Sequence, residues 1–178
     1  MHHVELLLDE ASDAAIREQW RALGEAGLPS QARHRSASNR PHVTLTMTES
    51  WPVGAELESA LTPLSALPLG ALLGAPTVFG RGPFVLVRAV VATDRLLALH
   101  RALADRLGPP ASALLLPGRW VPHVTLGHRM SSSQVAEALD LLGASDGPDV
   151  VVEAARHWDS VARTDEALLP PSGPAGPA

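Results

Sequence analysis

A chain of 178 residues has the length of one domain, or of two small lobes that share a core. Its net charge of -5 argues against an extended basic surface for long nucleic acid, although it leaves room for a local anion site. The lack of cysteine excludes disulfides, thiolate metal sites and a cysteine nucleophile. All 14 basic residues are arginine, so a P-loop lysine and a Schiff-base lysine are excluded as well.

The N-terminal segment and the apolar runs predict the compartment. Residues 1–10, MHHVELLLDE, lack a basic region followed by a long apolar run, so they do not resemble a signal peptide. Each apolar stretch is too short to span a membrane. We therefore expect a cytoplasmic protein that has no membrane partner and that is a monomer.

The first half of the chain predicts strand, helix, strand, helix and strand. Ile16, Trp20 and Leu23 recur at helical spacing, and Pro63 is expected to break or kink the second helix. A polar loop over residues 29–40 joins the first helix to the second strand. The predicted elements are a strand over 3–9, a helix over 11–27, a strand over 41–47, a helix over 54–67 and a strand over 71–80.

The second half predicts the same order of elements. Asp94 is expected to cap the third helix, and the serines at 131–133 offer caps for the fourth. The Pro/Gly/Ala-rich segment 162–178 predicts a disordered tail after a single domain over 1–161. The predicted elements are a strand over 83–93, a helix over 95–107, a strand over 122–128, a helix after the serines and a strand over 149–161.

One phrase of five residues, PHVTL, occurs in both halves. It occupies residues 41–45 and 122–126, so its histidines are 81 residues apart (123 minus 42). Each copy falls on the second predicted strand of its half. This self-similarity indicates a duplication and two lobes related by approximate two-fold symmetry.

Each copy of PHVTL predicts a strand with one polar and one apolar face, because side chains alternate along a strand. The apolar face suits packing against helices, whereas a face with His and Thr is expected to be wet. The predicted polar faces carry His42, Thr44 and Thr46 in the first copy and His123 and Thr125 in the second, and the apolar faces carry Val43, Leu45, Met47, Val124 and Leu126.

Two opposed polar faces would bring two imidazoles and two hydroxyls to one cleft. A histidine pKa of about 6.5 allows one ring to be neutral while the other is protonated near neutral pH. One ring can then take a proton from a nucleophile while the other protonates a leaving group, which phosphoester cleavage requires. The threonine hydroxyls would hold the non-bridging oxygens. This scheme needs neither a metal nor another cofactor.

The paired motif, His42-x-Thr44 and His123-x-Thr125, resembles that of the two-histidine phosphoesterase superfamily. This group includes bacterial 2′-5′ RNA ligases and RNA 2′,3′-cyclic phosphodiesterases. The resemblance covers residues 2–161 and implies an α+β fold. The expected architecture is two pseudo-symmetric lobes, each a small antiparallel sheet with outer helices, with a cleft between the lobes.

The resemblance also implies a reaction and its partner. Family members open a 2′,3′-cyclic phosphate, on a nucleotide or an RNA end, to a 2′-phosphate without a metal. His42 matches the acid that protonates the leaving 3′ oxygen, and His123 matches the base that activates water. Thr44 and Thr125 match the residues that hold the phosphate. The order of acid and base stays open, because the pair is pseudo-symmetric and the reverse reaction exchanges the roles.

Three alternatives remain beside this hypothesis. The same site would support reversible 2′-5′ RNA ligation. It would also support a module that binds a nucleotide or phosphate without catalysis, although pure binding does not require two titratable groups. A zinc site would use the same histidines, but zinc normally has three or four ligands, and neither motif strand contains Asp or Glu.

Two arginines are candidates for binding the phosphate. Arg129 would share a face with His123 and Thr125 if the strand continued, which would place His128 on the opposite face. Arg40 ends a basic loop that leads into the first motif. For both arginines, exposure to solvent without any role is an equal alternative.

Residues that would surround the cleft are harder to assign. Many family members use aromatic residues there to bind a nucleobase, but this chain has no tyrosine. Trp51 and Trp120 lie near the two motifs and would reach the rim. Glu5 would face the cleft and orient a histidine if the first strand were a neighbour of a motif strand. His100 falls on an apolar helix stripe and is expected in the core.

Overall fold

The computed structural model describes residues 1–36, 38–143 and 147–168. Within them the chain forms seven strands and four α-helices, with 3-10 turns at Gln31–Arg33, Thr62–Ala66 and Ala113–Leu115. The elements in chain order are β1 (His2–Leu8), α1 (Glu10–Glu25), β2 (His42–Thr48), α2 (Ala55–Leu61), β3 (Leu69–Phe79), β4 (Phe84–Val90), α3 (Asp94–Leu107), β5 (His123–Met130), α4 (Ser132–Leu142), β6 (Asp149–Asp159) and β7 (Thr164–Leu168).

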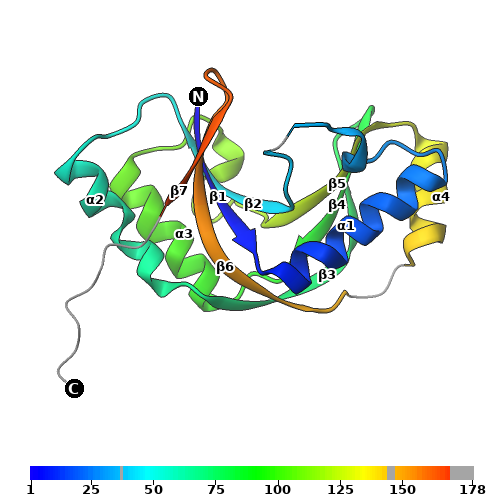
Figure 1. The fold of residues 1–178 in the computed structure, drawn as a ribbon, viewed down its shortest axis with the longest axis horizontal. Coiled ribbons are helices and arrows are strands. Elements are labelled where there is room, and N and C mark those ends of the chain that lie inside the picture. The colour runs from blue at the N-terminus through cyan, green and yellow to red at the C-terminus, as the bar shows by residue number, and fades with distance from the viewer. Residues whose placement is uncertain (37, 144–146, 169–178) are drawn as a thin grey trace.

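The strands form an antiparallel sheet in the order β2-β1-β6-β3-β4-β5, and β7 pairs with β6. The long strand β3 joins two lobes. Its residues 69–72 pair with β6, and from Leu73 onward it pairs with β4. One lobe therefore contains β2, β1, β6 and β7, and the other contains the second part of β3 with β4 and β5. This arrangement confirms the predicted α+β fold (Figure 1).

The two sequence halves exchange elements between the lobes. β3 ends the first half but pairs with β4, and β6 ends the second half but pairs with β1. Two helices also reach the other half of the sequence, because α3 contacts β2 and α2, and α1 contacts β5 and α4 in addition to β1 and β6. Figure 1 shows α1 and α4 at one end of the molecule and α2 and α3 at the other. A lobe is therefore not the same as a half of the sequence.

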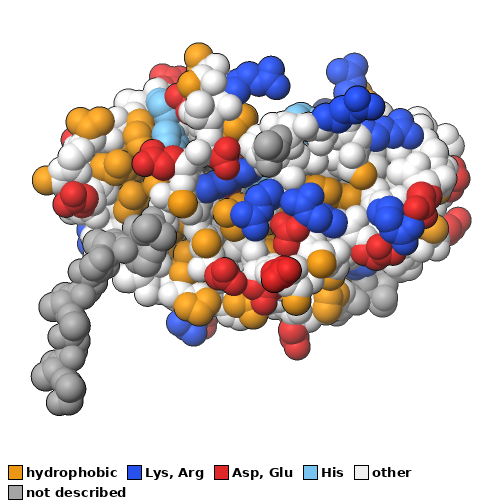
Figure 2. All heavy atoms as spheres, in the orientation of Figure 1, with side chains coloured by type: hydrophobic (Ala, Val, Ile, Leu, Met, Phe, Trp, Pro, Cys, Tyr) orange, Lys and Arg blue, Asp and Glu red, His pale blue; other side chains and the backbone are white. Residues whose placement is uncertain are grey.

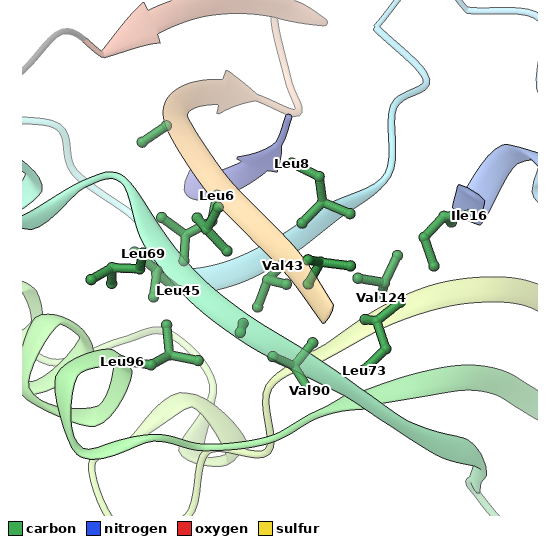
Figure 3. Close-up of a cluster of buried hydrophobic side chains, with 14 of the residues drawn as sticks. Leu6, Leu8, Ile16, Val43, Leu45, Leu69, Leu73, Val90, Leu96 and Val124 are labelled. Atoms are coloured by element: carbon green, nitrogen blue, oxygen red, sulfur yellow. The ribbon is translucent and has the colours of Figure 1, made fainter. Parts of the chain in front are cut away.

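The apolar faces of both PHVTL strands lie in the core, as predicted. Val43 is 1% exposed, and Leu45, Val124 and Leu126 are fully buried. Figure 3 shows Val43, Leu45 and Val124 among side chains from β1, α1, β3, β4 and α3. Burial of these aliphatic side chains stabilises each motif strand by about 1.5–3 kcal/mol per residue, and it holds the opposite face toward solvent.

The alternation predicted for the first motif fails after Leu45. The pairing of β1 with β2 shifts register between Val4 and Glu5, so β2 carries an extra residue at this point. Thr46 is buried and Met47 is half-buried, the reverse of the expected faces. The prediction for these two residues is wrong because a bulge changes the phase of the alternation.

The predicted helix ends are correct in part. Ser131 caps α4 in a capping box with Gln134, and α2 ends at Leu61 before a turn that contains Pro63. The cap of α3 is Thr93 rather than Asp94, since the Thr93 side chain accepts from the backbone N–H of Leu96. Within the described residues, each helix is too short or too polar to cross a membrane.

The prediction of disorder from residue 162 onward is wrong for its first part. Asp159 accepts hydrogen bonds from the backbone N–H groups of Val161 and Ala162, and this turn reverses the chain. Thr164–Leu168 then pair with β6 as β7, which satisfies an edge of β6 that β3 leaves free. The rest of the predicted tail, 169–178, lies outside the described residues.

Candidate active site

The two PHVTL strands lie side by side although they are the two ends of the strand order. β2 contacts β5 directly across the middle of the molecule (Figure 1). Two indoles bridge them reciprocally. The Nε1–H of Trp20 donates to the carbonyl of Thr125, and that of Trp120 donates to the carbonyl of Thr44, each at 2.9 Å. Each edge strand thus has a backbone acceptor satisfied by a tryptophan.

Both motif histidines are fixed by the same local hydrogen bond. The Nδ1 of His42 lies 2.7 Å from the carbonyl of Arg40, and the Nδ1 of His123 lies 2.8 Å from the carbonyl of Val121. A carbonyl only accepts, so Nδ1 carries the hydrogen in each ring. The Nε2 atom of each ring is therefore the one available for proton transfer.

A pocket of about 310 Å³ contains three of the six predicted site residues. His42, Thr44 and Thr125 all line it, so the two polar faces meet as expected. His123 borders a second pocket of about 410 Å³, which is mostly apolar. The residues of the first pocket are His3, Glu5, Gln31, His34, Ser38, Asn39, His42, Thr44, Thr125, His128, Arg156 and Trp158.

The surroundings of His123 favour its neutral form. Partial burial lowers its pKa, the hydrogen bond to Val121 opposes this change, and the charge of His42 lowers the pKa further. The ring of Phe79 meets His123 edge-on, with ring centroids 4.9 Å apart. His42 and His123 are thus close enough to interact electrostatically, and His123 has an apolar neighbour.

The surroundings of His42 are acidic. Its Nε2 lies 3.5 Å from Oε1 of Glu5, which is 4% exposed. Oε2 of Glu5 accepts a hydrogen bond from Nε of Arg156 at 2.8 Å and lies 2.8 Å from Nη2 of the same guanidinium. Glu5 lies in this position because β1 pairs with β2 on one side and with β6 on the other. The expected approach of Glu5 to a motif histidine is confirmed.

The predicted placement of Arg129 beside His123 and Thr125 is wrong. The pairing of β4 with β5 shifts register twice, once on each side of Gly127, and Arg129 has a positive φ of 59°. As a result His128 lines the pocket and the Arg129 side chain is exposed outside it. Partial burial lowers the pKa of His128, and the charges of His123, His34 and His42 lower it further.

The other residues that were predicted near the cleft do not line the first pocket. The guanidinium of Arg40 lies 3.7 Å from Asp13 outside the pocket, and only its carbonyl serves the site. Trp120 lines the apolar pocket and stacks on His100, which is buried as expected. Trp51 stacks on His157 and lines neither pocket.

Most of the other residues that line the pocket were not predicted, and four of them show why. Gly127 in the middle of a strand was a signal for the bulge that brings His128 into the pocket. His34 and Asn39 belong to the polar loop over residues 29–40, which has no periodic pattern that predicts where a side chain points. Trp158 comes from β6, and its position depends on the exchange of strands between the lobes. Among the described residues, no cluster of three His, Asp or Glu side chains is arranged to hold a metal ion.

Comparisons with known proteins show the family of this chain. The family model of the 2′-5′ RNA ligase superfamily matches residues 9–161. Similar solved structures include Usb1 of Kluyveromyces marxianus, at 11% identity over 94% of this chain and 96% of that one, with a TM-score of 0.49. The same protein with uridine monophosphate gives 13% identity over 94% and 96%, with a TM-score of 0.46. No curated protein matches the sequence. Because the family model spans most of the sequence, this chain belongs to the 2′-5′ RNA ligase superfamily.

Proposed function

We propose that this protein is a metal-independent phosphoesterase that hydrolyses the 2′,3′-cyclic phosphate of a nucleotide or an RNA end to a 2′-phosphate. One observation carries the proposal. Two strands lying side by side each present a His with Nδ1 fixed and Nε2 available, next to a Thr on the same face. Membership of the family supports the class of reaction.

Each motif side chain has a defined task in the proposed mechanism. The hydroxyls of Thr44 and Thr125 hold the non-bridging oxygens of the phosphate between the two rings. Nε2 of His123 takes a proton from water as the water oxygen attacks phosphorus. The bond from phosphorus to the 3′ oxygen breaks, and Nε2–H of His42 protonates that oxygen. The lowered pKa of His123 supports its role as the base.

The two pockets support a small substrate or a chain end. Gln31, Ser38 and Asn39 offer polar groups for a ribose or a base edge, and Trp158 offers an aromatic surface. Volumes of about 310 and 410 Å³ suit a mononucleotide rather than a duplex. On the face seen in Figure 2, arginines and acidic side chains are interspersed. Such a surface gives weak steering for long RNA.

Turnover of a nucleoside 2′,3′-cyclic phosphate in the presence of EDTA tests the proposal. We expect the cyclic phosphate to be opened, with a 2′-phosphate as the product in phosphorus NMR and with a bell-shaped dependence of kcat/KM on pH. Binding without turnover would contradict the proposal and favour a binding module. Activity that is lost on chelation and restored by a metal would contradict it in favour of a metal site.

The apolar pocket at His123 gives some support to a second candidate, 2′-5′ ligation. If His123 activates the nucleophile, this pocket has room for a nucleoside whose 5′-hydroxyl replaces water. The same two histidines would then act as base and acid without any new group. Adding an RNA fragment with a 5′-hydroxyl to the turnover assay tests for a 2′-5′-linked product.

A further inference from the structure

The two motif histidines are equivalent in their own strands. Each donates Nδ1–H to the carbonyl two residues before it, and each follows a proline. Each is also two residues from a threonine whose carbonyl accepts from an indole. The motif alone therefore leaves the two rings chemically alike. A difference between acid and base must come from residues outside the motif.

Glu5 supplies such a difference. In the sheet Glu5 lies opposite Thr44 of β2 on one side and Arg156 of β6 on the other. Both contacts from Arg156 go to Oε2, so Oε1 is left to face Nε2 of His42 at 3.5 Å. Glu5 and Arg156 are each 4% exposed, so the carboxylate acts on the imidazole with little screening by water.

Arg156 fixes the position of Glu5 and is itself held firmly. Its Nη1 donates to the carbonyl of Ser38 at 2.7 Å, and Asp165 of β7 lies 3.5 Å from the same atom. Arg156 thus ties β1, β6, β7 and the polar loop together. Because Arg156 is held in this way, it fixes Oε2 of Glu5, and Oε1 is directed toward His42.

We propose that Glu5, held by Arg156, is a positioning residue that keeps His42 protonated on both nitrogens, so that His42 starts the reaction as the acid. Nδ1 of His42 donates to the carbonyl of Arg40, and the carboxylate of Glu5 lies 3.5 Å from Nε2, so a proton on both nitrogens places a positive ring beside a negative charge. The contacts of His123 among the described residues are one carbonyl and the edge of Phe79. This inference rests on the proposed function for the role of His42, but not for its protonation.

Other charges also reach His42. Those that oppose a positive charge on the ring are the neighbouring imidazoles and the guanidinium groups of Arg156 and Arg40. Each guanidinium is paired with a carboxylate, Arg156 with Glu5 and Arg40 with Asp13. The charged and titratable groups around His42 are His3 and Glu5 of β1, Arg156 of β6, Asp165 of β7 through Arg156, His34 and Arg40 of the loop, and His123 and His128 of β5. Glu5 is the acidic group of this set that contacts the ring itself.

Glu5→Gln tests the proposal because it keeps the shape and removes the charge. The basic limb of the pH profile of kcat should move to lower pH by about one unit, since the acid then loses its proton earlier. At pH values above that limb, kcat should fall by about tenfold with KM nearly unchanged. The acidic limb, which reports the base, should stay in place.

Glu18→Gln is the matched control, because it makes the same change of charge at an exposed carboxylate that pairs with Arg21 outside the pocket. Its pH profile should equal that of the wild type. An unchanged profile in Glu5→Gln would overturn the proposal. A movement of the acidic limb instead would overturn it as well, because His42 would then be the base.

NMR titration of the wild-type imidazoles tests the proposal without any variant and without turnover. The ring of His42 should keep its second proton to a higher pH than the ring of His123, with signals assigned from His42→Ala and His123→Ala. The reverse order would overturn the proposal, even if Glu5→Gln did not fold. Absence of turnover with the expected order would instead count against the proposed function.

Discussion

β2 and β5 begin with the same four residues, HVTL, but they differ immediately afterwards. In both strands a histidine is fixed by a carbonyl two residues earlier, and a threonine carbonyl accepts from an indole. After the shared leucine, β2 continues with Thr46, which is buried, whereas β5 continues with Gly127 and then with His128 in the pocket. Both strands change register at this point, but by different irregularities.

The comparison separates what the motif determines from what its neighbours determine. The motif determines a strand with one buried apolar face, the hydrogen on Nδ1 of the histidine and the threonine hydroxyl beside each imidazole ring. The neighbours determine the polarity around each ring, because Glu5 faces His42 and Phe79 faces His123. A repeated motif thus has two different surroundings without any change in its own residues.

Loss of either motif imidazole is expected to have the largest effect. His42→Ala and His123→Ala should each reduce kcat for a 2′,3′-cyclic phosphate by about 10²–10⁴-fold, because each removes one of the two proton transfers. His128→Ala is the control for simple loss of an imidazole from the pocket, and it should lose less than about tenfold. Steady-state kinetics measures the reduction of kcat in each variant, and thermal melting checks that each variant is folded. Full activity in one motif variant would show that the two strands do not share the reaction.

The residue after each shared leucine should differ sharply in its tolerance of a side chain. A Cβ at Gly127 would lie 2.4 Å from the carbonyl oxygen of Pro29 and 2.8 Å from Cε of Met130. Gly127→Ala should therefore destabilise the protein by about 1–3 kcal/mol. Gly70→Ala in β3 is the control, because its Cβ would have no neighbour within 4 Å among the described residues. Denaturant unfolding measures both, and equal effects would contradict the close approach at β5.

A smaller effect of opposite sign is expected at the equivalent position of β2. Thr46 is 1% exposed, and its Oγ1 has no hydrogen-bond partner among the described residues. Thr46→Val keeps the shape and removes this hydroxyl, so it should raise stability by about 1 kcal/mol. Thr48→Val should lower it by about 1 kcal/mol, because the buried Oγ1 of Thr48 donates to the carbonyl of Ser50. Thermal melting of both variants gives the signs, and a loss of stability in Thr46→Val would contradict the prediction.

Much of the fold and the centre of the site could be predicted from the sequence. The period of two places His42 and Thr44 opposite Val43, and helical spacing places Ile16, Trp20 and Leu23 in the core. These patterns are local, so a single sequence carries them. The predictions failed where a bulge changed the phase, as at Met47 and Arg129, because register depends on the partner strand.

Other parts depend on contacts between distant residues, and no local pattern contains them. The approach of Glu5 to His42 requires β1 to lie between β2 and β6, and the place of Trp158 requires β6 to leave its own half of the chain. β7 was not predicted, because its composition resembles that of a disordered tail. Its pairing with the free edge of β6 depends on a strand that is distant from any local pattern. Thr93 and Asp94 are both residue types that cap helices well. The backbone position at which α3 begins decides that Thr93 is the cap.

The exchange of strands between the lobes has a consequence for how the protein is made. On the ribosome, β1 and β2 emerge first, but β6, which pairs with β1, emerges more than 100 residues later. The first lobe therefore cannot complete its sheet while the second half is still being translated. The pairing of β1 with β6 spans most of the chain, and pairings between residues so far apart in sequence are slow to form. Both halves of the sequence must therefore be synthesised before β1 can gain its partner on the β6 side.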